Sequence, residues 1–199
     1  MNEIIKKDGF PDAKVGLLAL QGAFDAHGRM CRSLGAQTRE LKIADDFDGC
    51  THIILPGGES TTFLKLFDYH DLRKPLLAAA QSGVPILATC AGLILLSNGI
   101  EGREQESLDV IDVSVERNAY GRQVHSFETE LALEKIGGST FHGVFIRAPK
   151  IVSVGKDVEV LSEHDGSAVL VRQGNILGST FHPELSGDRR IHEYFLSLG

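Results

Sequence analysis

The stretch "ILATCAGLILL", residues 86–96, decides the fold class. It holds two apolar runs that are joined by the small residues of "TCAG", residues 89–92. A continuous apolar run is typical of a strand that is buried on both faces of a parallel sheet. Small residues at the junction permit a sharp turn from such a strand into a helix. The stretch therefore predicts a strand–turn–helix unit with Cys90 at the carboxyl end of the strand.

The rest of the first half repeats this alternation of strand and helix. Helical spacing in "AFDAHGRMCRSLG" (23–35) predicts one helix, and residues 60–83 predict two further helical pieces. Strands separated by helices at these intervals indicate βαβ units and a parallel sheet. The predicted strands are "KVGLLAL" (14–20), "QTREL" (37–41), "THIILP" (51–56) and "VPILAT" (84–89).

The second half changes to short strands separated by glycine turns. The last two of them are predicted to pair as a hairpin across "QGN", residues 173–175, and a helix within 186–199 closes the chain, with Ser186 or Asp188 as its N-cap. We predict an α/β fold: a mostly parallel central sheet flanked by helices, flavodoxin-like, with an added antiparallel ribbon. Residues 14–199 are expected to form a single domain, and residues 1–13 a poorly ordered leader. The predicted strands are 110–116, 127–133, 141–148, 150–154, 158–163, 167–173 and 175–181.

Composition excludes several classes of protein. The chain has 199 residues, is 42% hydrophobic and carries a formal net charge of −7 without a basic stripe, which argues against nucleic-acid and anionic membrane surfaces as partners. The longest apolar run, residues 84–96, is too short to span a bilayer, and the N-terminus lacks the apolar core of a signal peptide. Three cysteines without paired spacing predict neither a disulfide framework nor a metal site. We expect a cytoplasmic protein with reduced thiols and no cofactor.

Cys90 has two interpretations at this point. Free cysteine is often a small buried core residue. Alternatively, the carboxyl edge of a parallel sheet is where ligands bind, and a cysteine lifted out of the sheet there is placed to act as a nucleophile. Such a nucleophile needs a base and a group that orients the base. "FHPE", residues 181–184, supplies both, because His182 and Glu184 would face one way along an extended backbone. The alternative for this pair is a surface histidine beside a surface glutamate.

A third element follows the predicted strand 51–56. In "PGGEST", residues 56–61, two glycines allow the backbone to approach a ligand and to offer its amides to an oxyanion. A glycine turn with a Ser/Thr helix cap is the alternative interpretation. The motif lacks the GK[ST] of a phosphate-binding P-loop. Nucleophile, base and oxyanion donor thus fall at three strand ends, in the chain order Cys, His, Glu, which differs from that of α/β-hydrolases.

Together, "PGGEST", "TCAG" and "FHPE" resemble the class I, triad-type glutamine amidotransferases. The strings "VERNAYGRQ" (115–123) and "FIRAP" (145–149) resemble one branch, the glutaminase subunits of pyridoxal 5′-phosphate synthases. Ile94 stands where broad class I enzymes often carry glutamine, which also fits this branch. The resemblance runs from about Val15 to the C-terminus.

The resemblance implies hydrolysis of L-glutamine to glutamate and ammonia through a glutamyl thioester. It implies that ammonia passes to a synthase subunit, which activates the glutaminase on docking within a large hetero-oligomer. Cys90 matches the nucleophile, His182 the general base and acid, and Glu184 the orienting acid. Gly57 and Ala91 match the oxyanion-hole amides. The residues that match the glutamine-binding positions are Gly58, Glu59, Ser60, Arg117, Ile146 and Arg147.

Two alternatives stay open on the sequence. One is a class I amidotransferase that serves another synthase. The other is a non-hydrolytic chaperone or redox protein with a cysteine at the same turn, in which the histidine would lie far from Cys90. We assign Cys31 and Cys50 to packing, and we place His192 on the surface or in the ribbon. His27 and His52 are candidates for docking the partner.

Overall fold

The computed structural model describes residues 9–101, 106–117, 126–138 and 140–199. Residues 1–8 of the predicted leader lie outside this part. Residues 9–13 are packed against the core, contrary to the prediction of a poorly ordered leader. Phe10 and Ala13 are buried in the core, and the Phe10 amide donates to the Leu34 carbonyl at 2.8 Å. The packed structure therefore begins before Lys14. Apolar side chains at two positions of this short segment are enough to hold it against α1 (Phe24–Ser33).

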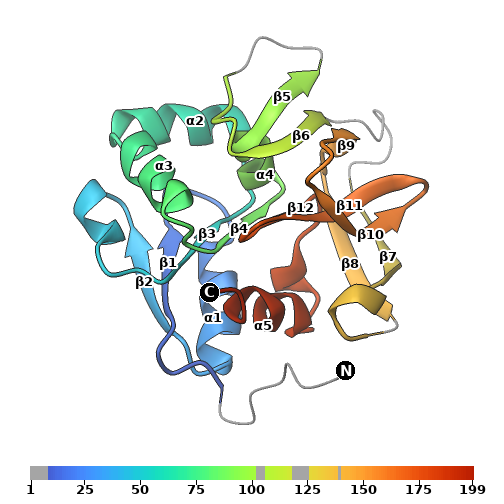
Figure 1. The fold of residues 1–199 in the computed structure, drawn as a ribbon, viewed down its shortest axis with the longest axis horizontal. Helices are drawn as coiled ribbons and strands as arrows, with labels where there is room; N and C mark the ends of the chain where they lie inside the picture. Colours follow the sequence, from blue (N-terminus) through green and yellow to red (C-terminus); the bar gives the residue numbers. More distant parts are fainter. Residues whose placement is uncertain (1–8, 102–105, 118–125, 139) are drawn as a thin grey trace.

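A seven-stranded sheet forms the centre of the molecule, in the order β10-β11-β12-β4-β3-β1-β2 (Figure 1). The five strands from β12 to β2 are parallel, as predicted. The two strands β10 and β11 add to one edge in antiparallel pairing, and β11 pairs with β12 as the predicted hairpin. The strands are β1 (Lys14–Leu18), β2 (Gln37–Leu41), β3 (His52–Leu55), β4 (Ile86–Thr89), β10 (Glu159–His164), β11 (Ser167–Gln173) and β12 (Ile176–Ser179).

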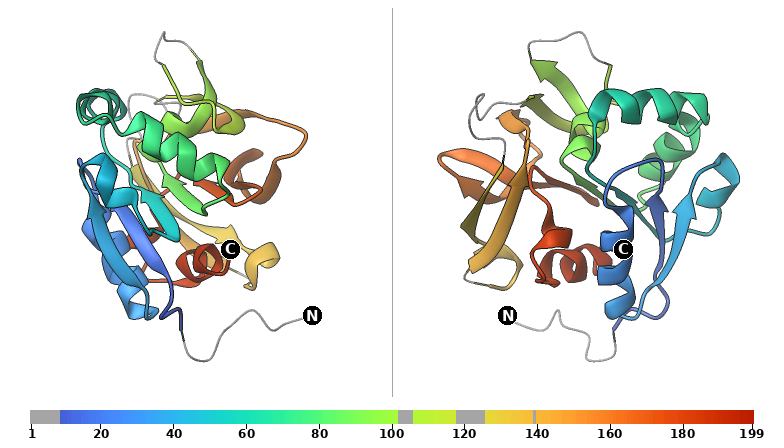
Figure 2. Two further views of the ribbon diagram at one scale, coloured as in Figure 1. Left: turned by 60° about the vertical axis from the view of Figure 1, so that its left-hand side comes forward. Right: turned by 180° about the vertical axis from the view of Figure 1, so that it is seen from behind.

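Helices cover both faces of this sheet (Figure 2). Side chains alternate between the faces: Ile54 and Leu87 belong to the core on one side, while Ile53, Leu55 and Ile86 belong to the core on the other. The first core includes side chains of α1 and of α5 (Arg190–Leu196). The second includes side chains of α2 (Ser60–Tyr69), α3 (Arg73–Gln81) and α4 (Ala91–Leu96). Three 3-10 turns complete the helical set: η1 (Ala44–Phe47), η2 (Glu134–Ile136) and η3 (Pro183–Leu185).

The start of α5 differs from the prediction. Its N-cap is Arg189, which makes no side-chain cap hydrogen bond, rather than Ser186 or Asp188. Asp188 still accepts from the Arg190 amide at 2.9 Å, so the expected side chain satisfies the first helical N–H from one position further out.

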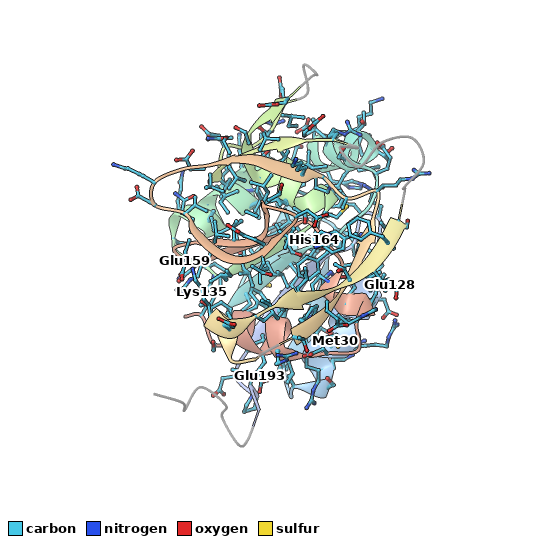
Figure 3. The ribbon with its side chains drawn as sticks, turned by 90° about the vertical axis from the view of Figure 1, so that its right-hand side faces the viewer. Met30, Glu128, Lys135, Glu159, His164 and Glu193 are labelled. Carbon is cyan, nitrogen blue, oxygen red and sulfur yellow. The ribbon has the colours of Figure 1, made fainter. Side chains whose placement is uncertain are left out.

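The predicted ribbon is two small sheets instead of one. β6 (Ile111–Glu116) pairs with β9 (Lys150–Val154) in antiparallel fashion, and β7 (Ser126–Ala132) pairs in the same way with β8 (Thr140–Ile146). The unpredicted strand β5 (Ser97–Glu101) pairs parallel to β6. Figure 3 shows the side that carries β7 and β10, with Glu128 and His164 labelled. Glu128 lies 2.8 Å from the His142 ring, and the His164 ring stacks on that of Phe127. No helix within the described ranges is long and apolar enough to cross a bilayer.

Candidate active site

The predicted sharp turn at Cys90 is present. Its backbone has φ 49° and ψ −104°, a conformation that L-residues rarely adopt, and the Cys90 amide donates to the Ser179 carbonyl of β12 at 2.8 Å. A Cβ on Gly92 would lie 2.3 Å from the Leu55 carbonyl oxygen, so the first turn of α4 passes too close to β3 for a larger residue. Strain of this kind persists where the surrounding structure holds it, and it is common at functional sites.

Cys90 opens onto a cavity of about 600 Å³ above the carboxyl edge of the sheet. Its side chain is largely buried, and the thiol points toward the Ile146 carbonyl oxygen at 3.9 Å. All predicted glutamine-binding residues line this cavity. Among the described residues, the lining consists of Gly58, Glu59, Ser60, Cys90, Ile94, Arg117, Ile146, Arg147 and His182. Ile94 is the lining residue to which the sequence interpretation gave no role in binding.

His182 and Glu184 meet through a turn, which corrects the expected extended geometry. The His182 backbone has φ −105° and ψ 85°, and its amide donates to the Val144 carbonyl at 2.8 Å. Pro183 then begins the 3-10 turn η3, as the fixed φ of proline favours. This turn brings the Glu184 carboxylate back toward the imidazole, with Oε1 2.8 Å from His182 Nδ1. Both side chains are buried, so the alternative of a surface pair is wrong.

The charge states of His182 and Glu184 depend on the groups around them. Burial of the His182 ring disfavours the imidazolium, but interactions with Cys90 and Glu184 outweigh it and raise the pKa of His182 to about 10. Burial likewise disfavours the Glu184 carboxylate, and the nearby His27 and His182 still hold its pKa below the ordinary value. The histidine is thus protonated at neutral pH between a thiol and a carboxylate.

This coupling predicts a change in the titration of His182 when the thiol is removed. In Cys90→Ala, one of its two supporting partners is lost, so the pKa of His182 should fall by about one unit or more. NMR titration of the ring proton measures the shift. His142 is the internal control, because exposed glutamates raise its pKa and Cys90 does not contribute. An unmoved His182 titration would contradict the coupling.

The loop after β3 packs against the same histidine. A Cβ on Gly57 would lie 2.4 Å from His182 Cε1 and 3.3 Å from the Cys90 Cβ, so Gly57 is fitted between them. A Cβ on Gly22 would lie only 1.7 Å from the Gly57 carbonyl oxygen, which fixes how close the two loops approach. The Gln21 amide group donates to the Glu59 carbonyl at 2.7 Å. Gly22 and Gly57, which come from separate loops, therefore allow the backbone after β3 to approach His182 and Cys90.

Glu59 combines both interpretations of "PGGEST". As the N-cap of α2, its carboxylate accepts from the amides of Thr62 at 2.7 Å and Thr61 at 3.2 Å. These hydrogen bonds, with those of Thr62 the strongest, lower the pKa of Glu59 to about 2. Arg117 lies 3.3 Å from the same carboxylate. The helix cap is thus also a fixed negative charge on the cavity wall.

The structure brings the predicted site residues together around one cavity edge. Glu184 lies behind the His182 ring, Gly57 beside it, and Ala91 at the first position of α4, whose amide has no intrahelical acceptor. His27 and His52 are buried, and His27 lies 3.3 Å from Glu184, so the docking hypothesis for both is wrong. His192 is fully buried as well, against the surface or ribbon position predicted for it. Within the described ranges, no cluster of His, Cys, Asp and Glu is arranged to hold a metal ion.

Comparison with known proteins finds relatives that cover most of this chain. The curated "Pyridoxal 5′-phosphate synthase subunit PdxT" of Thermotoga petrophila is 48% identical over 185 residues, which is 93% of this chain and 98% of that protein. The protein of the same name from Bacillus licheniformis is 48% identical over 184 residues, covering 92% and 93% of the two chains.

Solved structures also superpose on this chain over most of its length. A crystal structure described as a glutamine amidotransferase superposes with a TM-score of 0.87 at 45% identity and covers 92% of this chain and 97% of that one. A putative GMP synthase component from Thermoplasma acidophilum, at 18% identity and a TM-score of 0.68 over 94% and 93% of the chains, shares the fold. The model of the SNO glutamine amidotransferase family matches residues 17–198. This chain belongs to the SNO glutamine amidotransferase family.

Proposed function

We propose that this glutaminase hydrolyses L-glutamine at the Cys90 cavity and delivers the ammonia to a synthase subunit. Family membership makes the chain a glutamine amidotransferase of pyridoxal 5′-phosphate synthesis. One observation carries the placement of the reaction: Cys90 sits at a strained turn on a cavity that His182 also lines, and His182 is held 2.8 Å from a buried glutamate.

The three side chains divide the chemistry among them. The Cys90 thiolate attacks the side-chain amide carbon of glutamine, because the thiolate is the reactive form of cysteine. His182, held as an imidazolium, then gives a proton to the departing ammonia. The resulting glutamyl thioester is hydrolysed by a water molecule that the now neutral His182 activates. Glu184 orients the ring and stabilises its charged form.

The oxyanion of each tetrahedral intermediate is proposed to rest on the amides of Gly57 and Ala91. A Cβ on Gly57 would meet both the His182 ring and the Cys90 Cβ, which supports a position of its backbone beside the reacting carbon. Ala91 directly follows the nucleophile, in the first turn of α4. Fixed amides at such a position stabilise developing charge without reorganisation.

The charged groups of glutamine match the cavity wall. Its α-ammonium group fits the Glu59 carboxylate, and its α-carboxylate fits an arginine. Arg117 already faces Glu59 and Thr61, whereas Arg147 lines the cavity from a strained position with φ 45°. We assign the α-carboxylate to Arg147, with Gly58, Ser60 and Ile146 completing the binding surface.

This assignment predicts a binding defect in Arg147→Met. Loss of one charge-assisted hydrogen-bond pair should raise KM for glutamine by about tenfold to a hundredfold and change kcat much less. Steady-state glutamate release measures both constants. A variant with normal KM and low kcat would show that Arg147 does not hold the substrate.

The partner follows from the names of the relatives. They are synthase subunits, so we propose that this chain docks onto a synthase subunit that accepts its ammonia and activates it within a large hetero-oligomer. We place this complex in the cytoplasm. A class I amidotransferase of another synthase and a non-hydrolytic elbow-cysteine protein are not favoured, since the curated relatives over most of the chain are pyridoxal 5′-phosphate synthase subunits.

The proposal is tested by measuring glutamate release with and without the synthase subunit, and L-asparagine serves as the shorter control substrate. We expect release from glutamine that rises when the synthase subunit is present, and little from asparagine. Absence of glutamate release even with the partner would overturn the proposal.

A further inference from the structure

Behind Glu184, two further histidines continue the line of polar groups into the core. His27 of α1 places Nε2 3.3 Å from Glu184 Oε2, on the side opposite His182, and 3.4 Å from the hydroxyl of Thr89. His192 of α5 places Nε2 2.9 Å from His27 Nδ1. Both histidine side chains are fully buried, and α1 and α5 lie side by side in Figures 1 and 2. His27 thus lies next to the carboxylate, and His192 of α5 reaches it only through His27.

The acceptor chemistry of the group assigns the tautomers. An ionised carboxylate only accepts hydrogen bonds, so we assign the proton to the His27 nitrogen that faces Glu184, from which the Thr89 hydroxyl can also accept. A neutral His27 then presents the lone pair of Nδ1 to His192, which must donate from its own Nε2. His192 Nδ1 becomes an acceptor, and it has no hydrogen-bond partner among the described residues. The whole row points its protons toward Glu184.

We propose that His27 is a positioning residue of the glutaminase reaction, which holds Glu184 ionised and aimed at His182 through its Nε2–H, with His192 fixing the tautomer. This inference rests on the proposed roles of Cys90, His182 and Glu184. His27 itself does not line the cavity, because it lies behind the glutamate and faces Glu184 and His192.

The electrostatics of the row agree with neutral histidines. Burial lowers the pKa of His27 and outweighs Glu184, which raises it. Burial and the neighbouring His27 lower the pKa of His192 to about 3. The titratable groups that face Glu184 are His182 from its own turn and His27 from α1, with His192 behind the latter. A neutral N–H supports the anion there without adding a second cation beside the imidazolium.

The contact between His27 and Glu184 is within ion-pair distance but lacks the alignment of a hydrogen bond, so Glu184 Oε2 has no aligned donor among the described residues. Catalytic hydrogen bonds are often loose in free enzymes and tighten when substrate binds. A buried carboxylate oxygen without a donor is unfavourable, and the His27 imidazole is the group that stands within reach of it. His27 is therefore the described group placed to donate to Glu184 Oε2 when His182 and Glu184 act.

The test compares His27→Leu, which removes the N–H, with His27→Gln, whose amide nitrogen reaches the position of Nε2. We expect kcat with the synthase subunit to fall about tenfold to a hundredfold in His27→Leu, with KM nearly unchanged, and to recover largely in His27→Gln. Without its donor, Glu184 protonates at higher pH. The acid limb of the kcat/KM profile should therefore move upward by about one pH unit in His27→Leu.

His52→Leu is the matched control. His52 is buried to a similar degree and hydrogen-bonds to the Leu198 carbonyl at 3.0 Å, and its ring packs edge-on against Phe195 of α5. Replacement of His52 loosens the packing of α5, the helix that also carries His192, without touching Glu184. It should therefore lower stability and leave the acid limb of the kcat/KM profile in place. His192→Leu gives a second variant if His27→Leu does not fold, and its acid limb should shift in the same direction by a smaller amount.

A readout without turnover separates this inference from the proposed function. Alkylation of Cys90 by iodoacetamide, followed by mass spectrometry of the Cys90 peptide, reports the pH at which the thiolate–imidazolium pair forms. We expect that pH to rise in His27→Leu and not in His52→Leu. If the wild type hydrolyses glutamine while His27→Leu keeps the wild-type profile in both assays, the inference is overturned. If the wild type releases no glutamate, the proposed function fails instead.

Discussion

Replacement of Cys90 by alanine is expected to abolish glutamine hydrolysis, lowering kcat by at least about 1,000-fold even with the synthase subunit present. Alanine removes the sulfur that forms the thioester, and no other described nucleophile shares its position between His182 and the cavity. The fold should survive, because alanine is smaller than cysteine and the turn at residue 90 is held by the hydrogen bond that its backbone amide donates to the Ser179 carbonyl. Glutamate release and thermal unfolding measure the two effects.

The remaining cysteines serve as controls for this substitution. Cys31 is fully buried, and burial raises the pKa of its thiol to about 12, so it is not a nucleophile at neutral pH. Cys50 is half-buried and points to the Asp46 carbonyl at 3.5 Å. Cys31→Ala and Cys50→Ser should keep full glutaminase activity. Substantial activity in Cys90→Ala would show that the reaction takes place elsewhere.

Gly57→Ala is expected to lower kcat by about 100-fold or more, since displacement of a reacting group by about 1 Å has effects of this size. The new methyl group would meet the His182 ring at 2.4 Å and the Cys90 side chain at 3.3 Å. Either the imidazole moves away from the thiol or the loop after β3 moves away from both. The second outcome also withdraws the Gly57 amide from the oxyanion, so the two routes lead to the same loss.

Gly99→Ala is the matched control for the loop variant. Gly99 lies on β5 and is not among the described residues that line the cavity, and the described side chain that its added methyl group would meet is that of Ser114, with the hydroxyl at 3.2 Å. We expect nearly normal kcat in this variant. Equal activities in Gly57→Ala and Gly99→Ala would mean that the close approach of Gly57 to His182 has no part in the reaction.

The central fold could be predicted because its signals are local. The buried parallel strands β1, β3 and β4 have continuous apolar runs, and each is followed by a helix that ends at a glycine or a polar turn. Strand β5 escaped prediction, because "SNGIE" has a weak strand signal and forms its ladder only beside β6. The packing of Phe10 was not predicted either, since it depends on a contact with Leu34 that no local sequence pattern reveals.

The candidate site was predictable to the extent that its parts lie at strand ends. Motifs at the ends of β3, β4 and β12 identified Cys90, His182 and the glycine loop before any contact was known. The geometry of His182 and Glu184 was not, because a 3-10 turn and an extended strand both allow residues two apart to meet. His27 gave no signal, since a single histidine on an amphipathic helix resembles any core-facing residue. Its role depends on packing between α1, η3 and α5.

The most direct test of the central claim is the identification of the covalent intermediate. Wild-type protein with its synthase subunit is mixed with glutamine, quenched in acid within the first turnovers and digested for mass spectrometry. A glutamyl group attached to the peptide that contains Cys90, and absent from the peptides of Cys31 and Cys50, is the predicted result. Glutamine turnover without any acylated cysteine, or with the glutamyl group on another residue, would contradict the account.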